Sequence, residues 1–192
     1  MPSRKSSSRA QFGPEMKILL MGSFIWYFGE GMLGPLYAIF AQHIGGDILD
    51  ITGAWAVYLI TTGVISILIG RRMKNKLDMK YWMIIGYGLN AAATFGYILV
   101  DSPLSLLIVQ LVLGVASALA TPTWDALYSI YESRKKAGTQ WGIADGGPHI
   151  VTGIAVLFGG FVIALTGFTT LFIIMGLIQI LAVAVQTKII LK

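Results

Sequence analysis

Long apolar segments separated by short polar stretches make up nearly the whole chain. A helix rises about 1.5 Å per residue, so about 20 apolar residues are needed to cross about 30 Å of hydrocarbon. Six segments of that length follow one another at 18–41, 52–70, 81–100, 103–128, 141–165 and 168–187. Residues 84–100 and 171–185 are apolar on every face, unlike the alternating strands of a transmembrane barrel. We therefore predict an all-α integral membrane protein with six transmembrane helices.

The composition supports this prediction and excludes several other classes. Of the 192 residues, 56% are hydrophobic and only 12% are charged, whereas a soluble domain has about 25% charged residues. A soluble enzyme, a disordered chain and collagen are therefore excluded. Because the chain has no cysteine, it has no disulfide, zinc-thiolate site, iron-sulfur cluster or cysteine nucleophile.

The basic residues predict which side of the membrane each loop faces. With six crossings, both ends and the second and fourth loops lie on one side, and that side holds every Lys and Arg. The four clusters are Arg4, Lys5, Arg9 and Lys17; Arg71, Arg72, Lys74, Lys76 and Lys80; Arg134, Lys135 and Lys136; and Lys188 and Lys192. We therefore predict a multi-pass protein of the plasma (cytoplasmic) membrane with both termini cytoplasmic. The net charge of +5 then indicates contact with lipid headgroups rather than with nucleic acid.

The chain is expected to consist of a short polar tail and a transmembrane bundle. Residues 1–16 are polar and basic without periodicity, which predicts a disordered cytoplasmic tail and no signal peptide. Residues 17–192 are expected to form the transmembrane bundle. Because the longest loops have about ten residues, any function is expected to lie inside the bundle or on its rim.

Four ionisable side chains fall inside predicted membrane segments: Glu30, Asp125, Asp145 and His149. A charge at the centre of a transmembrane helix costs about 2.5–3.5 kcal/mol on insertion scales, so each needs a specific reason. No Lys or Arg accompanies them, which disfavours a phosphate or carboxylate substrate. A neutral solute, a cation or a proton fits this set better.

Glu30 shares a helix face with Trp26, Gly34 and Tyr37, and this face of one carboxylate, aromatic rings and a small residue could hold a cation or a proton. The alternative is a protonated Glu30 that is hydrogen-bonded to a neighbouring helix. Gly34 and Pro35 predict a bend in this helix, either as a hinge or as a simple kink.

Asp125 extends a stripe of small and polar residues on the fourth predicted helix, next to Thr121 and Trp124. Such a stripe either packs against another helix or lines water. Pro122 lies in the same stretch and is a second candidate hinge.

Asp145 and His149 are four residues apart on the fifth predicted helix and therefore share a face. They are candidates for an inner gate or a proton relay. The alternative is a hydrated salt bridge from Asp145 to nearby basic residues. Pro148 is a further candidate hinge.

The remaining polar and aromatic residues suggest no chemistry. Trp55, Trp82 and Trp141 fall at helix ends, where an interfacial aromatic belt is expected. No motif of a serine hydrolase, zinc protease or nucleotide-binding loop occurs, so we expect no enzyme activity and no cofactor. His43 and Asp47 supply too few ligands for a metal site.

The arrangement of six helices resembles one half of a Major Facilitator Superfamily transporter. The resemblance rests on the run at 113–127, on Gly138-Thr139-Gln140-Trp141-Gly142, on the opening helix and on the basic second loop. The loop motif of the family survives as a remnant in Gly70, Arg71, Arg72 and Lys74. Its acidic residue is absent, since Lys74 stands at that position, and Gln110 stands where many proton-coupled members have arginine.

The resemblance implies a homodimer, because family members pair two six-helix halves around a shared site. Two copies would bring two Glu30 and two Asp125 side chains around one cavity, with the third and sixth helices facing lipid. The hypothesis is a secondary active transporter that works by alternating access, moves a small neutral or cationic solute and has the proton as a candidate coupling ion. The alternatives are a non-transporting subunit that assembles with another membrane protein, and a truncated half with no independent role.

Overall fold

The computed structural model describes residues 12–73 and 75–191, which form seven α-helices and one short 3-10 helix. The elements are α1 (Pro14–Gly31), α2 (Leu36–His43), α3 (Ile48–Gly70), α4 (Lys76–Gly96), η1 (Tyr97–Leu99), α5 (Pro103–Tyr131), α6 (Ala137–Thr166) and α7 (Phe168–Thr187). The prediction of an all-helical protein is confirmed. Five of these helices, α3 to α7, are long and apolar enough to cross a membrane.

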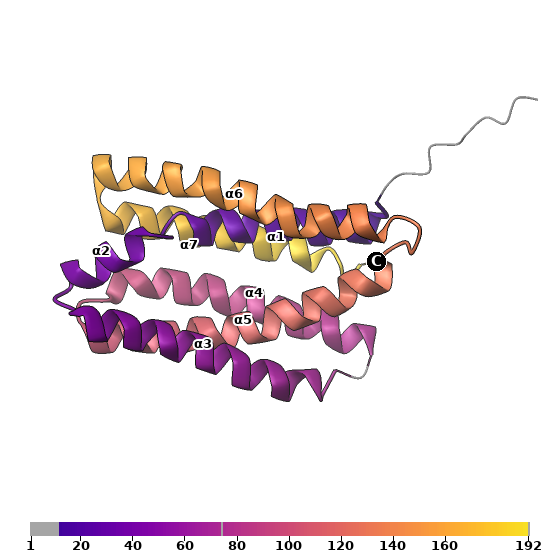
Figure 1. Cartoon of the computed structure of the whole chain (residues 1–192), viewed down its shortest axis with the longest axis horizontal. Coiled ribbons are helices and arrows are strands. Elements are labelled where there is room, and N and C mark those ends of the chain that lie inside the picture. The colour runs from indigo at the N-terminus through magenta and orange to yellow at the C-terminus, as the bar shows by residue number, and fades with distance from the viewer. Residues whose placement is uncertain (1–11, 74, 192) are drawn as a thin grey trace, which may run out of the picture.

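The predicted first span, 18–41, consists of two helices rather than one. Helix α1 ends at Gly31 and α2 begins at Leu36, and Gly34 between them has a positive φ of 23°. Pro35 has no N–H to donate to the Gly31 carbonyl, so the regular ladder cannot continue. The expected bend is therefore a break, and α1 and α2 together run along the length of the bundle (Figure 1).

Several helices begin earlier than the apolar pattern predicts, because polar side chains cap them. Asp47 accepts hydrogen bonds from the backbone N–H groups of Leu49 and Asp50 at the start of α3, and Asn75 caps α4 in the same way. Helix α1 begins at Pro14, so the last residues of the predicted disordered tail are helical. Residues 1–11 of that tail lie outside the described residues.

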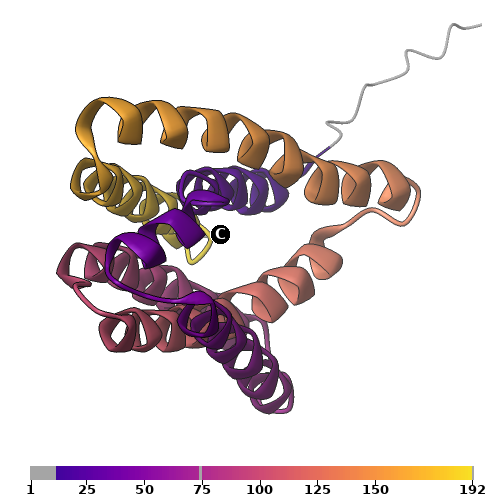
Figure 2. The same cartoon turned by 60° about the vertical axis from the view of Figure 1, so that its left-hand side comes forward.

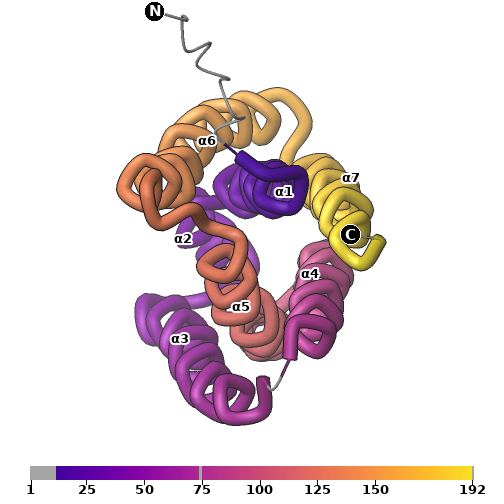
Figure 3. The backbone as a smooth tube through the Cα atoms, turned by 90° about the vertical axis from the view of Figure 1, so that its right-hand side faces the viewer, coloured from indigo at the N-terminus to yellow at the C-terminus, as the bar shows by residue number. Residues whose placement is uncertain are grey.

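The long helices form two groups of three. Helix α1 packs against α6 and α7, and α5 packs against α3 and α4, while α4 and α7 join the groups. Figures 1 and 2 show the long helices running roughly along one axis, and Figure 3 shows the two groups end-on. The first group thus combines α1 from the N-terminal half of the sequence with α6 and α7 from the C-terminal half. The second group combines α5 from the C-terminal half with α3 and α4 from the N-terminal half.

Two close contacts of glycine with a neighbouring helix hold these groups together. A Cβ atom on Gly159 of α6 would overlap the carbonyl oxygen of Met32 at the break after α1. A Cβ atom on Gly86 of α4 would lie 2.6 Å from the backbone N of Ala120 in α5. These positions therefore require glycine for the helices to approach so closely.

Exposed apolar surface is concentrated on α3 and α6. Leu59, Ile60 and Ile67 on α3 and Leu157 and Phe161 on α6 are among the exposed side chains. Helices α4 and α7, the third and sixth in the predicted series, bury more of their residues inside the chain than α3 and α6 do. The single chain therefore exposes more apolar surface on α3 and α6 than on the two helices that the resemblance places against lipid.

The described ends of the chain lie together with the α3–α4 and α5–α6 loops at one end of the bundle (Figure 1). The described residues of the basic clusters that are predicted for one side of the membrane thus come from segments at a single end. Gly70 is the last residue of α3, and Arg71 is its C-cap. Lys74, the remaining residue of the loop-motif remnant, lies outside the described residues.

Candidate functional site

A cavity of about 530 Å³, here called the first cavity, opens between the two groups of helices. Its lining comes from all seven α-helices of the described residues, from η1 and from the break between α1 and α2. The polar and aromatic lining residues are Tyr27, Glu30, Tyr37, Trp55, Tyr58, Thr94, Tyr97, Gln110, Asp145, His149 and Thr152. Lys and Arg do not occur among the described residues that line it.

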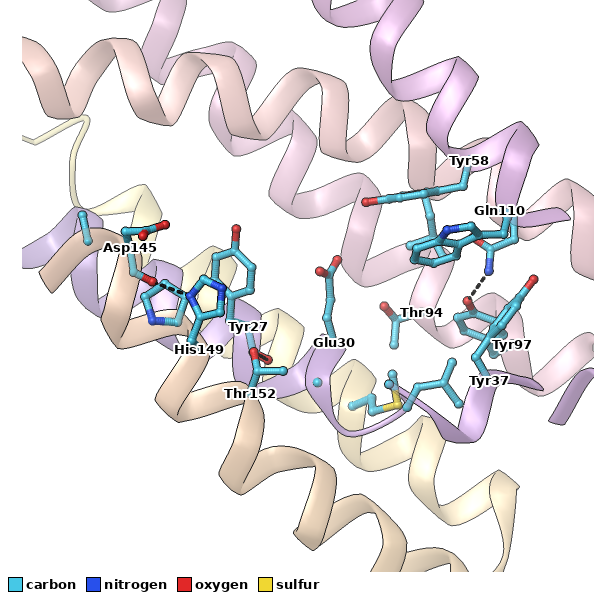
Figure 4. A pocket seen from close by; sticks show the side chains of 18 residues that line it. Tyr27, Glu30, Tyr37, Tyr58, Thr94, Tyr97, Gln110, Asp145, His149 and Thr152 are labelled. Atoms are coloured by element: carbon cyan, nitrogen blue, oxygen red, sulfur yellow. Dashed lines mark hydrogen bonds between the residues drawn. The ribbon is translucent and has the colours of Figure 1, made fainter. Parts of the chain in front are cut away.

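Glu30 lies near the middle of the first cavity, one residue before the end of α1. Its side chain points into the cavity, with the side chains of Tyr27 and Tyr58 on either side of it (Figure 4). It is partly exposed. The position that the sequence singled out is therefore part of a polar cavity and is not enclosed between packed helices.

One end of the first cavity carries a group of hydrogen-bonding side chains. Gln110 donates its amide N–H to the hydroxyl of Tyr97 at 3.0 Å, and Tyr37 lies beside them (Figure 4). Many proton-coupled members of the family have an arginine at the position of Gln110. In this chain the position carries a neutral amide and no positive charge.

Asp145 and His149 lie on the other side of Tyr27 from Glu30 (Figure 4). His149 Nδ1 is 2.7 Å from the backbone carbonyl oxygen of Asp145, and the carboxylate does not take part in this hydrogen bond. Because a carbonyl oxygen can only accept, Nδ1 carries a proton and the other ring nitrogen, Nε2, remains for a solute or a proton. The two residues share a helix face as predicted, but their contact is with the backbone.

A second cavity, of about 510 Å³, adjoins the first. It contains Thr121 and Asp125 of α5, both exposed, and shares Tyr27, Ala144 and Asp145 with the first cavity. The two cavities thus share part of their walls on α1 and α6, and together they are here called the path.

Two of the residues predicted to line the pathway, Trp26 and Trp124, make contacts that hold helices together. The Trp124 indole N–H donates to the Leu19 carbonyl at 3.0 Å and ties α5 to α1. Trp26 packs edge-on against Tyr87 with ring centroids 4.4 Å apart. Both residues line the second cavity, but they are mostly buried.

The candidate hinges differ from one another. Gly34 and Pro35 coincide with the break between α1 and α2. Pro122 and Pro148 lie inside α5 and α6, which continue through them. A change in helix direction is therefore built into the chain at the first cavity, next to Glu30.

Several lining residues were not predicted from the sequence. Tyr27 is three residues before Glu30 and shares its helix face, so the spacing could have indicated it. Tyr58, Thr94 and Tyr97 come from other helices, and no local pattern marks them as neighbours of Glu30. Trp55, predicted for an interfacial belt, lies in the cavity wall, where its ring stacks on Tyr58.

Together, the helices long and apolar enough to cross a membrane and the two adjoining cavities indicate a multi-pass membrane protein with space for a small solute. The chain belongs to the Major Facilitator Superfamily, which matches it over residues 19–190. This confirms the resemblance seen in the sequence and places the chain in a family of transporters, not of enzymes.

The chain is also similar to an uncharacterised MFS-type transporter from Methanocaldococcus jannaschii. The two are 24% identical over 169 residues, which cover 88% of this chain and 44% of the relative. This chain therefore spans less than half the length of the curated relative that it matches.

Proposed function

We propose that this chain is a secondary active transporter that moves a small neutral or cationic solute by alternating access. The observation that carries the proposal is the lining of the first and second cavities, which contains Glu30, Asp125 and Asp145 and no described Lys or Arg. Carboxylates in a membrane interior attract a cation or a proton. Within the path, Glu30 is the primary binding group and Asp145 and His149 form the inner gate.

The proposed topology has six crossings, with α1 and α2 together making the first. Both termini are cytoplasmic, because the segments that carry the basic clusters lie at one end of the bundle (Figure 1). This orientation places the second cavity, with Asp125, toward the cytoplasm and the first cavity deeper in the membrane. The membrane is the plasma membrane, and lipid headgroups contact the basic loops.

We further propose that a second copy of this chain completes the site. In this family two six-helix halves, related by an axis along the membrane normal, enclose the substrate between them. A twofold axis facing α1 and α5 would bring the cavities of both copies together. Rocking of the two copies at the breaks after α1 would then expose the path to alternate sides.

Transport by purified protein in liposomes tests this function. Radiolabelled amines and neutral polyols are added outside, with and without a pH gradient, and uptake is compared between the original chain and Glu30→Gln. Loss of the carboxylate is expected to weaken solute affinity about 10- to 100-fold, because a hydrogen bond to a charged group contributes about 1.5–3 kcal/mol.

Glu15→Gln is the matched control, since Glu15 is a carboxylate of the same helix outside both cavities. Uptake that is unchanged in Glu30→Gln would contradict the assignment of Glu30. Native mass spectrometry from lipid nanodiscs tests the pairing: the mass of two copies is expected, and a single copy would overturn the homodimer.

A second candidate is a non-transporting subunit of another membrane protein, favoured by the exposed apolar faces of α3 and α6. In that case Glu30→Gln leaves transport by the assembly unchanged but alters its assembly or thermal stability.

A further inference from the structure

Helices α3 and α6 share one side of the bundle. They belong to different groups of three helices, and in the end-on view both lie at the left, below and above the near end of α5 (Figure 3). Of the five described helices that are long enough to cross a membrane, these two bury the smallest share of their residues. Both also contribute to the wall of the first cavity. A partner on this side would therefore contact α3 and α6 and cover the cavity.

A line of glycines runs along α6 between its cavity wall and its exposed apolar surface. Gly146, Gly153 and Gly160 are seven residues apart, which is close to two helical turns and keeps them on one face. A Cβ atom on any of them would meet nothing within 4 Å in the described part of the chain. By helical spacing, His149 of the cavity wall lies on one side of this line and the exposed Leu157 on the other.

Helix α3 carries a matching line of small residues. Ala56, Gly63 and Gly70 have the same spacing of seven residues, and all three are exposed. A Cβ atom on Gly63 would again meet nothing within 4 Å among the described residues. Tyr58 of the cavity wall lies on one side of this line and the exposed Ile60 on the other. On both helices, small residues thus separate the cavity wall from the apolar surface.

Elsewhere in the bundle, glycine marks the places where two helices touch. A Cβ atom on Gly114 of α5 would lie 2.8 Å from the Tyr58 carbonyl oxygen in α3, and one on Gly31 of α1 would lie 3.1 Å from Thr152 in α6. Small residues in a membrane helix allow a second helix to come close. Because the two lines have no such contact within one chain, they fit a helix from another molecule.

The two lines are complementary to each other. Helix α3 ends at the end of the bundle where α6 begins (Figure 1), so the two run in opposite directions, and a twofold axis along the bundle preserves this between two copies. Equal spacing then lets every small residue of one line face a small residue of the other. The facing pairs are Gly70 with Gly146, Gly63 with Gly153, and Ala56 with Gly160. A shift of three residues would instead set Gly63 opposite Ile150 or Val156.

Charges at one end of the lines agree with this register. Asp145 precedes Gly146, is exposed, and its carboxylate has no hydrogen bond or ion pair among the described residues. Arg71 follows Gly70 and is also exposed. Pairing the two glycines therefore places Arg71 of one copy at the level of Asp145 of the other. Opposite charges at one level favour this register over shifted ones.

We propose that α3 of one copy packs antiparallel against α6 of a second copy along these two lines, in a contact here called the α3–α6 seam. A twofold dimer has two identical seams, because each copy gives one helix to each of them. The polar walls of both copies then enclose one shared cavity, and the apolar surfaces with Ile60 and Leu157 face lipid. This inference rests on the proposed function, because it names the surface through which the proposed homodimer forms.

Disulfide cross-linking tests the register directly, because the chain has no cysteine of its own. Two copies with different tags are expressed together, one with Gly63→Cys and the other with Gly153→Cys, and membranes are oxidised. A covalent dimer with both tags is expected. Gly63→Cys with Gly160→Cys is the control, since roughly 10 Å of helix separates the two levels and Cα atoms more than about 7 Å apart do not form a disulfide.

Gly70→Cys with Gly146→Cys provides a second pair at the same register. If neither predicted pair forms the covalent dimer, or if the control pair forms it equally well, the seam is overturned.

Gly153→Leu tests the seam without cross-linking. Its side chain would hold α3 of the second copy away, so the fraction of paired copies in native mass spectrometry should fall at least about fivefold. The unfolding free energy of the separated single chain should stay the same, because a Cβ atom at this position meets nothing. Gly88→Leu on α4, where a Cβ atom also meets nothing within 4 Å, should leave pairing unchanged. Equal pairing in Gly153→Leu and the original chain would overturn the seam.

The seam and the proposed function can fail separately. Cross-linking at the predicted pairs without solute uptake into liposomes would support the seam and contradict transport. Uptake by a two-copy protein that does not cross-link at these pairs would support transport and overturn the seam. A single copy in the mass spectrum would overturn both the homodimer and the seam.

Discussion

Polar side chains on the two sides of α1 have different surroundings. On the side that faces α7 and α4, here called the packed side, glutamine side chains bond to the backbone of α1: Gln179 donates to the Trp26 carbonyl at 3.1 Å and Gln186 to the Leu19 carbonyl at 3.3 Å. On the cavity side, Glu30 and Asp125 line open space. One helix thus combines a structural face and a face that is available to a solute.

The difference shows that a polar residue in a membrane segment is not by itself a functional signal. Gln186 also donates to the Tyr87 hydroxyl at 3.0 Å, so two of its contacts are internal. Satisfaction on the packed side is incomplete, because the buried Asn90 amide and the side-chain carbonyl oxygens of Gln179 and Gln186 have no hydrogen-bond partner among the described residues. What separates the two sides is whether the polar atom meets another helix or a cavity.

The largest loss of stability is expected where two helices are too close to admit a side chain. Gly159→Leu should destabilise the protein by about 3 kcal/mol or more, because its side chain would overlap the Met32 carbonyl at the break after α1. The free energy of unfolding is measured by SDS titration in bicelles.

The adjacent Gly160 provides the control, since a Cβ atom there meets nothing within 4 Å. Gly160→Leu should leave the unfolding free energy nearly unchanged. If the two substitutions are equally damaging, the close approach of α6 to α1 is not what makes Gly159 necessary.

A smaller loss is expected on the packed side. Gln186→Leu removes two hydrogen bonds and leaves the buried Tyr87 hydroxyl without its donor, which should cost about 2 kcal/mol. Solute uptake by the folded fraction should persist, because Gln186 lines neither cavity.

Gln42→Leu, at an exposed glutamine of α2, controls for the change in polarity. If Gln186→Leu had normal stability but no uptake, Gln186 would serve transport and not packing, which would contradict the structural role assigned to the packed side.

The sequence was sufficient for the class of fold and for part of the site. The length of the apolar segments predicted helices, five of which are long and apolar enough to cross a membrane, and the cost of burying a charge singled out Glu30. The break after α1 was expected only as a bend, because the pattern places Gly34 and Pro35 but does not give the dihedral angles. Tyr58 and Tyr97 line the same cavity as Glu30 but come from other helices, and contacts between helices depend on packing that no local pattern encodes.

A still smaller effect is expected where α5 joins α6. Tyr128 donates its hydroxyl to the Gln140 carbonyl at 2.6 Å, so Tyr128→Phe should lower the unfolding free energy by about 0.6–1 kcal/mol. Tyr81→Phe, at an exposed position, should have no measurable effect in the same titration. Equal stability of the two variants would mean that this hydrogen bond contributes nothing to the packed interior.

The smallest effect on stability is expected at the cavity side itself. Asp125 is exposed in the second cavity, so Asp125→Asn, which keeps the shape of the side chain, should change the unfolding free energy by less than about 0.5 kcal/mol. If Asp125 lines the solute path, the same variant should nevertheless reduce uptake of a cationic solute, with Glu15→Gln, a carboxylate outside both cavities, as the control. A stability loss as large as that of Gln186→Leu would show that Asp125 is held by another helix, and the contrast between the packed side and the cavity side would then not extend to the second cavity.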